Sequence, residues 1–216
     1  MQYKLISFDF DGTLCNTFDA IKAALSIVIP NVNLDCLSDK LTSGESFIAV
    51  LHALTDSVLS HSEILGLYDN FCQVYNAQCT ALQTLYPYTS ALLTDCRSQG
   101  AKLAIVSNKD EKAIVDFLDV NELSCMFDLI IGERKGLRKK PSADSYHSII
   151  QPAFPKLIPH EMLHFGDTLI DIDYAKAIGA SSVYVCHGFG RDDICIAHEP
   201  TYVCASFREY SSQIFN

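Results

Sequence analysis

The feature that most restricts the fold of this chain is the alternation of short apolar stretches with amphipathic segments in its second half. Strands are predicted at 102–106, 127–131, 162–165, 182–186 and, over two residues, at 203–204. Helical periodicity covers 88–99, 110–120, 142–151 and 171–178. Apolar strands separated by helices of about ten residues form βαβ units. We therefore predict an α/β fold with a doubly wound parallel sheet that is covered by helices on both faces.

A further strand at 5–8 opens the chain and ends in the acidic turn Asp9-Phe10-Asp11-Gly12-Thr13. Alternate residues of a strand share a face, and glycine lets the backbone turn sharply, so Asp9 and Asp11 are expected in one crevice. Two acids this close repel each other unless a proton or a cation intervenes. The pair suits phosphate chemistry assisted by Mg²⁺, and a solvated acidic turn is the alternative interpretation.

The segment 16–84 breaks the alternation. It is expected to be helical at 17–29, 45–54 and 61–79, with no strong strand. The simplest explanation is a helical cap inserted after the first strand. We therefore predict two domains, a core formed by 1–15 and 85–216 and a cap formed by 16–84.

Polar residues follow several of the predicted strands. Right-handed crossovers place the carboxyl ends of parallel strands at one edge, where such sheets bind ligands. The residues expected at this edge are Asp9, Asp11, Ser107, Asn108, Lys140, Asp167 and, one helical turn later, Asp171. Carboxylates gathered in this way are unfavourable without a cation. Few and hard oxygen ligands favour Mg²⁺, which uses one or two carboxylates together with substrate phosphate.

These residues lie in motifs that resemble those of the haloacid dehalogenase (HAD) superfamily, and within it the phosphoglycolate-phosphatase-like group with a helical cap. The motifs occur in the family's order: Asp9-Phe10-Asp11-Gly12-Thr13, Ser107-Asn108, Lys140-Pro141 and Gly166-Asp167-Thr168-Leu169-Ile170-Asp171. The resemblance covers the core, whereas the cap is similar in position and helical character more than in residues. It implies a Rossmann-like core and a Mg²⁺-dependent phosphatase.

The resemblance also implies catalytic roles. Asp9 is the expected nucleophile, which forms an aspartyl-phosphate. Asp11 protonates the leaving alkoxide and then deprotonates the water that hydrolyses the intermediate. Ser107 and backbone N–H groups near Asn108 bind the phosphoryl oxygens, and Lys140 balances charge on Asp9 and on these oxygens.

The same resemblance implies a set of metal ligands. The side chains of Asp9 and Asp167 and the backbone carbonyl of Asp11 would contact Mg²⁺ directly. Asp171 would hold a water on the metal.

Asp11 separates the branches of this superfamily. A halide leaves without a proton, whereas an alkoxide needs one, so Asp11 favours phosphoryl transfer over dehalogenation. The expected reaction is hydrolysis of a small phosphate monoester, with phosphoglycolate favoured by resemblance. The alternatives are a phosphatase for sugar phosphates, nucleotides or pyrophosphate, a phosphomutase, and a non-catalytic binding protein of the same fold.

The composition bears on partners and location. A net charge of -10 argues against a nucleic-acid-binding protein, which needs a basic face. The apolar stretches are too short to span a bilayer, and no secretory signal precedes the first strand. The nine cysteines are scattered without a CxxC pair, which favours reduced thiols in the cytoplasm. A small phosphorylated metabolite is the expected partner, and the protein is expected to be a monomer or a homodimer.

Several features stay open at this level. The basic residues of 134–140 form either a solvated loop or a region that steers anions. The segment 42–45 is either a loop that contacts substrate or a helix start. The loop 187–190 is either a simple turn or a flap over the site. The role of Cys15, six residues beyond Asp9, is undetermined.

Overall fold

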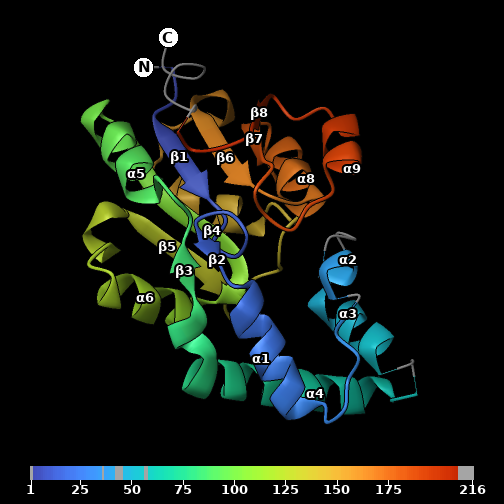
Figure 1. Cartoon of the computed structure of the whole chain (residues 1–216). Helices are drawn as coiled ribbons and strands as arrows, with labels where there is room; N and C mark the ends of the chain where they lie inside the picture. Colours follow the sequence, from blue (N-terminus) through green and yellow to red (C-terminus); the bar gives the residue numbers. More distant parts are fainter. Residues whose placement is uncertain (1, 36, 42–45, 56–57, 209–216) are drawn as a thin grey trace.

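The computed structural model describes residues 2–35, 37–41, 46–55 and 58–208, and its centre is a six-stranded sheet with the strand order β5-β4-β1-β6-β7-β8 (Figure 1). Every neighbouring pair in this sheet is parallel. The strands are β1 (Leu5–Phe8), β4 (Lys102–Asp110), β5 (Leu129–Glu133), β6 (Met162–Gly166), β7 (Ser181–Val185) and β8 (Tyr202–Cys204). The predicted α/β class and parallel sheet are therefore confirmed.

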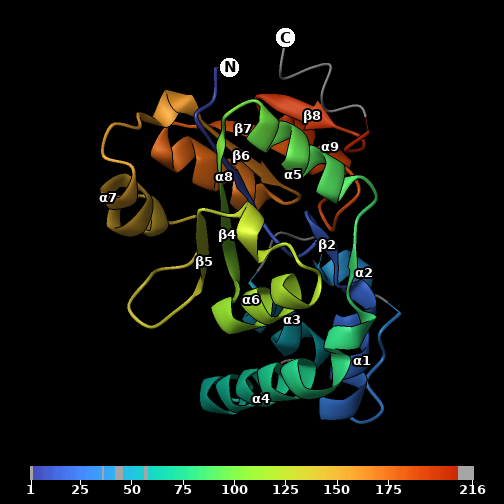
Figure 2. The same ribbon diagram turned by 90° about the vertical axis from the view of Figure 1, so that its left-hand side faces the viewer.

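Helices cover both faces of the sheet because alternate strand residues point in opposite directions. On one face, Ile6 and Phe8 pack with α5 (Thr89–Ser98) and α6 (Glu111–Val120). On the other face, Leu5 packs with α8 (Leu169–Ile178) and with the helix formed by the π-helical turn η4 (Tyr146–Ile150) and α7 (Gln151–Ala153). The views in Figures 1 and 2 show these layers on either side of the strands.

Three further elements complete the sheet-containing part. The helix α9 (Asp192–Ala197) packs on α8 through a small cluster of Ile172, Tyr184 and Cys195. The 3₁₀ turns η3 (Ser124–Met126) and η5 (Pro159–Glu161) precede β5 and β6.

The carboxyl end of β4 differs from the prediction. We expected Ser107 and Asn108 to follow a strand that ends at residue 106, but β4 continues to Asp110. Its register with β5 shifts between Val106 and Asp110, and Asp110 pairs with Glu133. Ser107 and Asn108 therefore lie in an irregular stretch of β4 between these two pairs, and the strand continues past them.

The helical part of the chain gathers beyond the end of the sheet to which β1 points (Figures 1 and 2). It contains α1 (Phe18–Val28), α2 (Leu37–Leu41), α3 (Phe47–Leu54), α4 (His61–Val74), the π-helical turn η1 (Tyr75–Cys79) and the 3₁₀ turn η2 (Thr80–Leu82). It has a hydrophobic cluster of its own, in which α1 contributes Ala20, Ile21, Ala24 and Leu25 at helical spacing. A capping box between Ser60 and Glu63 begins α4. The predicted helical segment between the first strand and the rest of the sheet is thus present.

Two connections join the helical part to the sheet. They pair with each other as the antiparallel strands β2 (Cys15–Asn16) and β3 (Thr84–Leu85). The sequence of 16–84 indicates no strong strand, and β2 and β3 are too short to show a periodic pattern there. The short helices α2 and α9 were not predicted either. Within the described residues, no helix is long and apolar enough to cross a membrane.

Candidate active site

The turn after β1 points its carboxylates out of the end of the sheet. The N–H of Asp9 donates to the carbonyl of Phe165 on β6 (2.8 Å), and the N–H of Phe10 donates to Asp9 Oδ1 (2.7 Å). Gly12 has a φ of 76°, in the left-handed region that favours glycine. A side chain at Gly12 would also overlap the carboxylate of Asp167. Glycine therefore allows this turn to lie directly against the loop that follows β6.

Three of the predicted carboxylates form one cluster. Asp9, Asp167 and Asp171 each offer an oxygen, and these atoms all lie within 4.8 Å of one another. Burial, together with the charges of Asp171 and Asp9, raises the pKa of Asp167 well above its usual range. Burial also raises the pKa of Asp9 to about 6. The cluster thus holds more negative charge than the surrounding protein balances, which is the condition under which a cation binds.

Asp167 is held in place from two sides. The Thr13 hydroxyl donates to Oδ1 (3.0 Å), and the N–H of Phe189 donates to Oδ2 (2.7 Å). A side chain at Gly188 would overlap Asp167 and the carbonyl of Gly12. The loop 187–190, which the sequence left open between a turn and a flap, therefore packs on the acidic cluster and fixes the orientation of one of its members.

Lys140 is buried among these carboxylates. Its Nζ lies 2.6 Å from Asp171 Oδ1 and 3.1 Å from Asp9 Oδ1. Burial by itself would lower the pKa of Lys140, but the charges of Asp171 and Asp9 raise it above its usual value. Burial would raise the pKa of Asp171, but the Lys140 ammonium and the hydrogen bond to His164 hold it below its usual range. Asp171 and Lys140 are therefore both charged at neutral pH.

His164, on β6, lies beneath the cluster and is not among the site residues predicted from the sequence. Its Nε2 is 3.3 Å from Asp171 Oδ1, and its Nδ1 is 2.8 Å from the hydroxyl of Ser7 on β1. Burial lowers the pKa of His164 to about 4, so the ring is neutral at neutral pH. A lone histidine within an apolar strand gives no signal in a single sequence.

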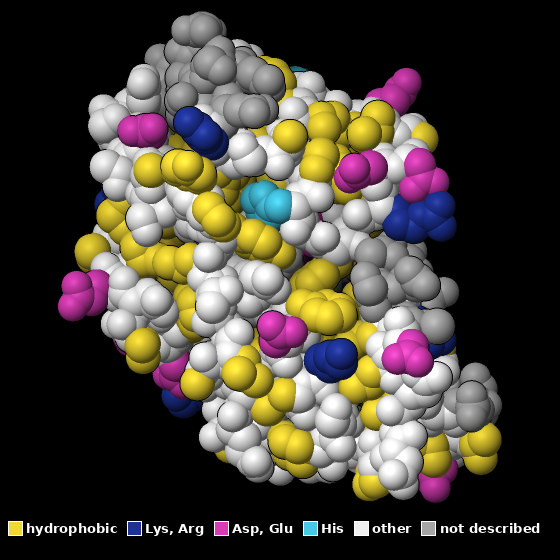
Figure 3. All heavy atoms as spheres, in the orientation of Figure 1, with side chains coloured by type: hydrophobic (Ala, Val, Ile, Leu, Met, Phe, Trp, Pro, Cys, Tyr) yellow, Lys and Arg dark blue, Asp and Glu magenta, His cyan; other side chains and the backbone are white. Residues whose placement is uncertain are grey.

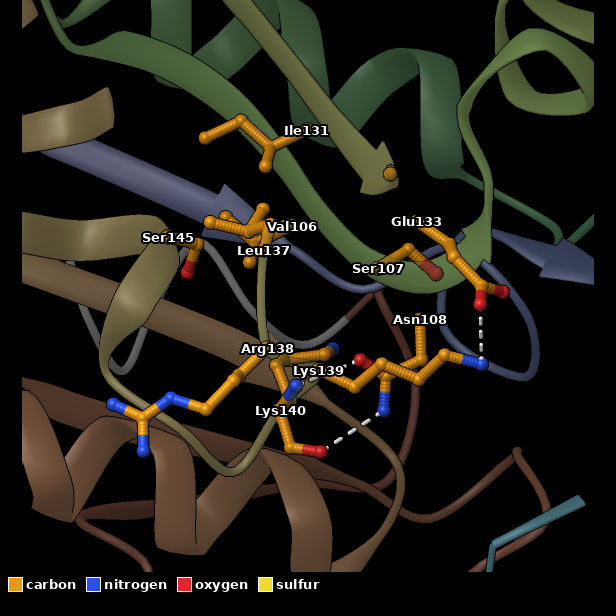
Figure 4. A pocket seen from close by; sticks show the side chains of 11 residues that line it. Val106, Ser107, Asn108, Ile131, Glu133, Leu137, Arg138, Lys139, Lys140 and Ser145 are labelled. Carbon is orange, nitrogen blue, oxygen red and sulfur yellow. Dashed lines mark hydrogen bonds and ion pairs between the residues drawn. The ribbon is translucent and has the colours of Figure 1, made fainter. Parts of the chain in front are cut away.

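Asn108 has a structural contact that the sequence did not predict. Its Oδ1 accepts from the N–H of Lys140 (2.8 Å), and its Nδ2 donates to the Lys140 carbonyl (3.1 Å), as Figure 4 shows. The amide therefore pairs with the backbone of Lys140 on both sides and anchors the loop that carries the ammonium. The hydroxyl of Ser107 accepts from the N–H of Lys109 (3.3 Å) at the same strand end.

The side chain of Asp11 lies apart from the other three carboxylates. Both of its oxygens contact Lys109 Nζ, at 3.0 and 3.3 Å. Lys109 was not predicted as a site residue. The available signal was its position two residues after Ser107, at the same strand end.

A cavity of about 830 Å³ opens in front of these groups. The sheet edge contributes polar residues to its wall, among them Asp9, Asp11 and Ser107. The helical part contributes an apolar wall that includes Ile21, Phe47, Val50, Phe71 and Tyr75. The nucleophile predicted from the sequence therefore faces a space much larger than a phosphate group. A separate small cavity of about 10 Å³, near the size of one water, lies beside Ser107 and Ser145 (Figure 4).

The basic loop 134–140 is largely paired with acidic neighbours. Arg134 contacts Glu111, Arg138 Nη2 lies 2.6 Å from Asp144 Oδ1, and Lys139 Nζ lies 2.9 Å from Glu133 Oε1. On the face drawn in Figure 3, acidic and basic side chains are interspersed. These pairings favour the solvated-loop interpretation over a free anion-steering patch.

Two other features were left open by the sequence. Cys15 is buried in β2, and burial raises the pKa of its thiol, which favours the protonated, unreactive form. The candidate substrate loop at 42–45 lies outside the described residues.

Comparisons with known proteins agree with the motifs. The family model described as "Haloacid dehalogenase-like hydrolase" matches residues 6–185. A phosphoglycolate phosphatase of Vibrio vulnificus is 28% identical over 221 residues, covering 96% of this chain and 94% of that protein.

Solved structures agree on the fold. A haloacid dehalogenase-like family hydrolase of Streptococcus pneumoniae superposes with a TM-score of 0.83 at 23% identity, covering 98% of both chains. A structure described as a predicted phosphatase of Clostridium acetobutylicum superposes with a TM-score of 0.85 at 19% identity, covering 99% of this chain and 98% of that one.

Proposed function

Because the chain belongs to the haloacid dehalogenase-like hydrolase family, we propose that it is a Mg²⁺-dependent phosphatase that hydrolyses small phosphate monoesters through an aspartyl-phosphate on Asp9. The observation that carries this proposal is the position of Asp9. Its carboxylate lines a large cavity, lies 3.1 Å from the Lys140 ammonium and belongs to a cluster of three acids.

The proposed reaction has two steps. In the first, a carboxylate oxygen of Asp9 forms a bond to phosphorus, the bond from phosphorus to the leaving oxygen breaks, and Asp11 gives that oxygen a proton. In the second, water attacks phosphorus, Asp11 takes a proton from the water, and the bond from Asp9 to phosphorus breaks to release phosphate. With a pKa of about 6, Asp9 is mostly ionised at neutral pH, as a nucleophile must be.

The residues around Asp9 can bind and neutralise the transferring group. Lys140 carries a positive charge beside Asp9 and would attract the phosphoryl oxygens. The hydroxyl of Ser107 lies on the cavity wall and would donate to one of these oxygens. Asn108 lines the cavity too, but its side chain is paired with the Lys140 backbone, so we assign its side chain to positioning Lys140.

The three clustered carboxylates fit a magnesium ion. They supply hard oxygen atoms within 4.8 Å of one another, and burial and mutual repulsion raise the pKa values of Asp9 and Asp167. We propose Asp9 and Asp167 as direct ligands together with the backbone carbonyl of Asp11. Asp171 is proposed as an outer partner because both of its oxygens already have partners, Oδ1 in Lys140 and His164 and Oδ2 in Thr168. When bound, Mg²⁺ would neutralise the charge on the phosphoryl group and on Asp9.

Two classes of phosphate monoester are candidate substrates. Phosphoglycolate is the first, because the relative from Vibrio vulnificus is named a phosphoglycolate phosphatase. A larger phosphate monoester, such as a sugar phosphate or a nucleotide, is the second. The cavity of about 830 Å³ with its apolar wall favours the second, since phosphoglycolate would leave most of that space empty.

We also propose that residues 16–84 act as a cap domain over this cavity, moving on the connections β2 and β3. A cytoplasmic location is proposed from cysteine usage, since the eight cysteines that the structure describes carry no disulfide.

The test is phosphate release from a panel of monoesters and pyrophosphate, with Mg²⁺ and with EDTA. The expected result is Mg²⁺-dependent release that Asp9→Asn lowers roughly a thousandfold or more, with unchanged thermal unfolding. Asp95→Asn, the same change at an exposed position on α5, is the matched control and should retain wild-type activity.

Two results would contradict the proposal. Near-normal turnover by Asp9→Asn would show that Asp9 is not the nucleophile. Silence of the wild type across the whole panel would favour a phosphomutase or a non-catalytic binding role.

A further inference from the structure

Lys109 occupies an unusual position between the sheet edge and the helical part of the chain. It stands near the end of β4, and its side chain is only 9% exposed. A buried ammonium is costly unless charges and hydrogen-bond acceptors surround it. The groups that contact the Lys109 ammonium therefore indicate its role.

Three acceptors meet the three hydrogens of this ammonium. Asp11 Oδ1 and Oδ2 lie 3.0 and 3.3 Å from Nζ, and the hydroxyl of Tyr75 lies 3.0 Å away. The ammonium also stands 4.1 Å from the centre of the Tyr75 ring and 5.7 Å from that of Phe10. The hydrogen-bond donors of Lys109 are therefore used by Asp11 and Tyr75, and the ammonium is not free to bind another anion.

Tyr75 gives this contact a rigid second side. It is the first residue of η1, is 3% exposed and belongs to the hydrophobic cluster of the helical part, where its ring lies 5.7 Å from that of Phe71. Burial, with the nearby charge of Asp11, raises the pKa of the phenol, so the hydroxyl stays neutral. A residue of the helical part thus fixes a lysine of the sheet edge.

From this arrangement we infer that Lys109 is a positioning residue for Asp11, and that Tyr75 is the group through which the helical part holds Lys109. The inference rests on the proposed role of Asp11 as general acid and base. The first proton transfer needs the Asp11 carboxyl within hydrogen-bond distance of the leaving oxygen, and the second needs it within hydrogen-bond distance of the attacking water. The side chain of Asp11 is 27% exposed and could rotate by itself, and the contacts to Lys109 fix its orientation.

The inference predicts a dependence on the leaving group. Nitrophenolate leaves without a proton, so positioning of Asp11 matters little in the first step with p-nitrophenyl phosphate. It matters in the second step with any substrate, because water must lose a proton. With an alkyl phosphate such as glycerol 2-phosphate, it matters in both steps.

The experiment compares these two substrates in Lys109→Met. With p-nitrophenyl phosphate we expect a rapid burst near one equivalent of nitrophenolate, followed by a steady state about 10- to 100-fold slower than wild type. With glycerol 2-phosphate we expect a similar loss without a burst of alcohol. Tyr75→Phe, which keeps the ring and removes the hydroxyl, should give the same pattern with a loss of a few-fold.

The matched control is Lys112→Met, which removes an exposed lysine from α6 that pairs with Asp116. It should behave as wild type. An equal loss with both substrates and no burst would overturn the inference in favour of a general structural role. A higher KM with unchanged kcat would overturn it in favour of direct substrate binding.

A second measurement does not depend on turnover. The melting temperatures of Lys109→Met, Tyr75→Phe and the double variant form a double-mutant cycle. The sum of the losses in melting temperature of the two single variants should exceed the loss of the double variant. Strictly additive losses would overturn the contact between these residues even if the wild type proved inactive. Wild-type inactivity on its own would contradict the proposed function and leave the result of the cycle standing.

Discussion

His164 shows how a single buried residue supports the acidic cluster. His164 on β6 lies opposite Ser7 on the neighbouring strand β1. Its ring bridges Ser7 and Asp171, which is at the start of α8. Asp171 already accepts a hydrogen bond from the Lys140 ammonium (2.6 Å). A neutral ring at this point provides a polar partner for Asp171 without adding a second positive charge beneath the carboxylates.

The pKa of His164 leads to a prediction about acid stability. The folded state lowers this pKa from 6.5 to about 4, so the unfolded chain binds the proton first as the pH falls. The contribution of His164 to stability is therefore full above pH 6.5 and is lost between pH 6.5 and 4, by on the order of 3 kcal/mol in total. We expect His164→Gln to remove this dependence when free energies of unfolding by urea are compared with those of wild type across this range.

His160→Gln, at an exposed position in η5, is the control for that comparison. The difference in free energy between wild type and His164→Gln should shrink as the pH falls toward 4. A difference that is constant from pH 7 to pH 4 would show that His164 is not buried in its neutral form.

At the scale of elements, the loop between β7 and α9 is as important to the cluster as the strands are. It supplies the Phe189 N–H to Asp167, and Phe189 also packs against the hydrophobic cluster of the helical part. The ring centres of His187, in the same loop, and Tyr86, beside β3, are 4.0 Å apart. This loop therefore contacts the acidic cluster, the helical part and one of its connections.

Close packing makes Gly188 sensitive to a single added methyl group. A Cβ there would overlap Asp167 and the Gly12 carbonyl, so Gly188→Ala must displace one of these two loops. We expect a loss of about 1–3 kcal/mol in the free energy of unfolding. Because a shift of Asp167 by about 1 Å also disturbs the proposed metal site, we expect roughly a hundredfold loss in kcat/KM.

Gly66→Ala is the control for the added methyl group. Nothing lies within 4 Å of a Cβ at Gly66 on α4, and alanine favours a helix over glycine, so this variant should be as stable as wild type or more stable. Thermal unfolding and steady-state kinetics of both variants check the prediction. Wild-type behaviour of Gly188→Ala would mean that the loop does not pack on Asp167 as described.

At the scale of the whole molecule, one side of α4 and η1 faces the sheet edge. Tyr68 and Tyr75 are separated by seven residues, or two helical turns, and both line the large cavity. The Tyr68 hydroxyl donates to Glu133 Oε2 (2.8 Å). Lys139 Nζ lies 5.1 Å from the centre of the Tyr68 ring. Figure 4 shows Glu133 and Lys139 paired with each other, and both residues also line this large cavity. The two tyrosines therefore connect the helical part to the ends of β5 and β4.

This arrangement predicts the effect of removing the Tyr68 hydroxyl. A hydrogen bond to a carboxylate contributes about 1 kcal/mol or more, so Tyr68→Phe should raise the open population of the proposed cap about fivefold or more. Faster amide hydrogen exchange along α4, with unchanged exchange in β1 and β6, would report this. Tyr88→Phe removes a hydroxyl from an exposed tyrosine and is the control. Equal exchange in α4 for both variants would contradict the role of Tyr68.

Local patterns in the sequence determined the sheet, the inserted helices and the set of polar residues at the strand ends. Strand alternation, helical periodicity and turn residues act over a few neighbouring positions, and parallel crossovers then bring Asp9, Ser107 and Asp167 to one edge. The catalytic and metal-binding roles of these residues remain predictions that the proposed kinetics test. The irregular end of β4 and the two-residue connections were not predictable, because neither produces a periodic signal.

Only the tertiary structure decided which of these polar groups act on one another. The contacts of Lys109 join residues 98 and 34 positions apart in the chain, and His164 reaches Ser7 across 157 positions. Such contacts depend on strand register, on the height of each helix above the sheet and on the rotamer of each side chain. A carboxylate at a strand end is encoded locally, but whether a lysine, a histidine or another carboxylate lies beside it is set by the packing of distant segments.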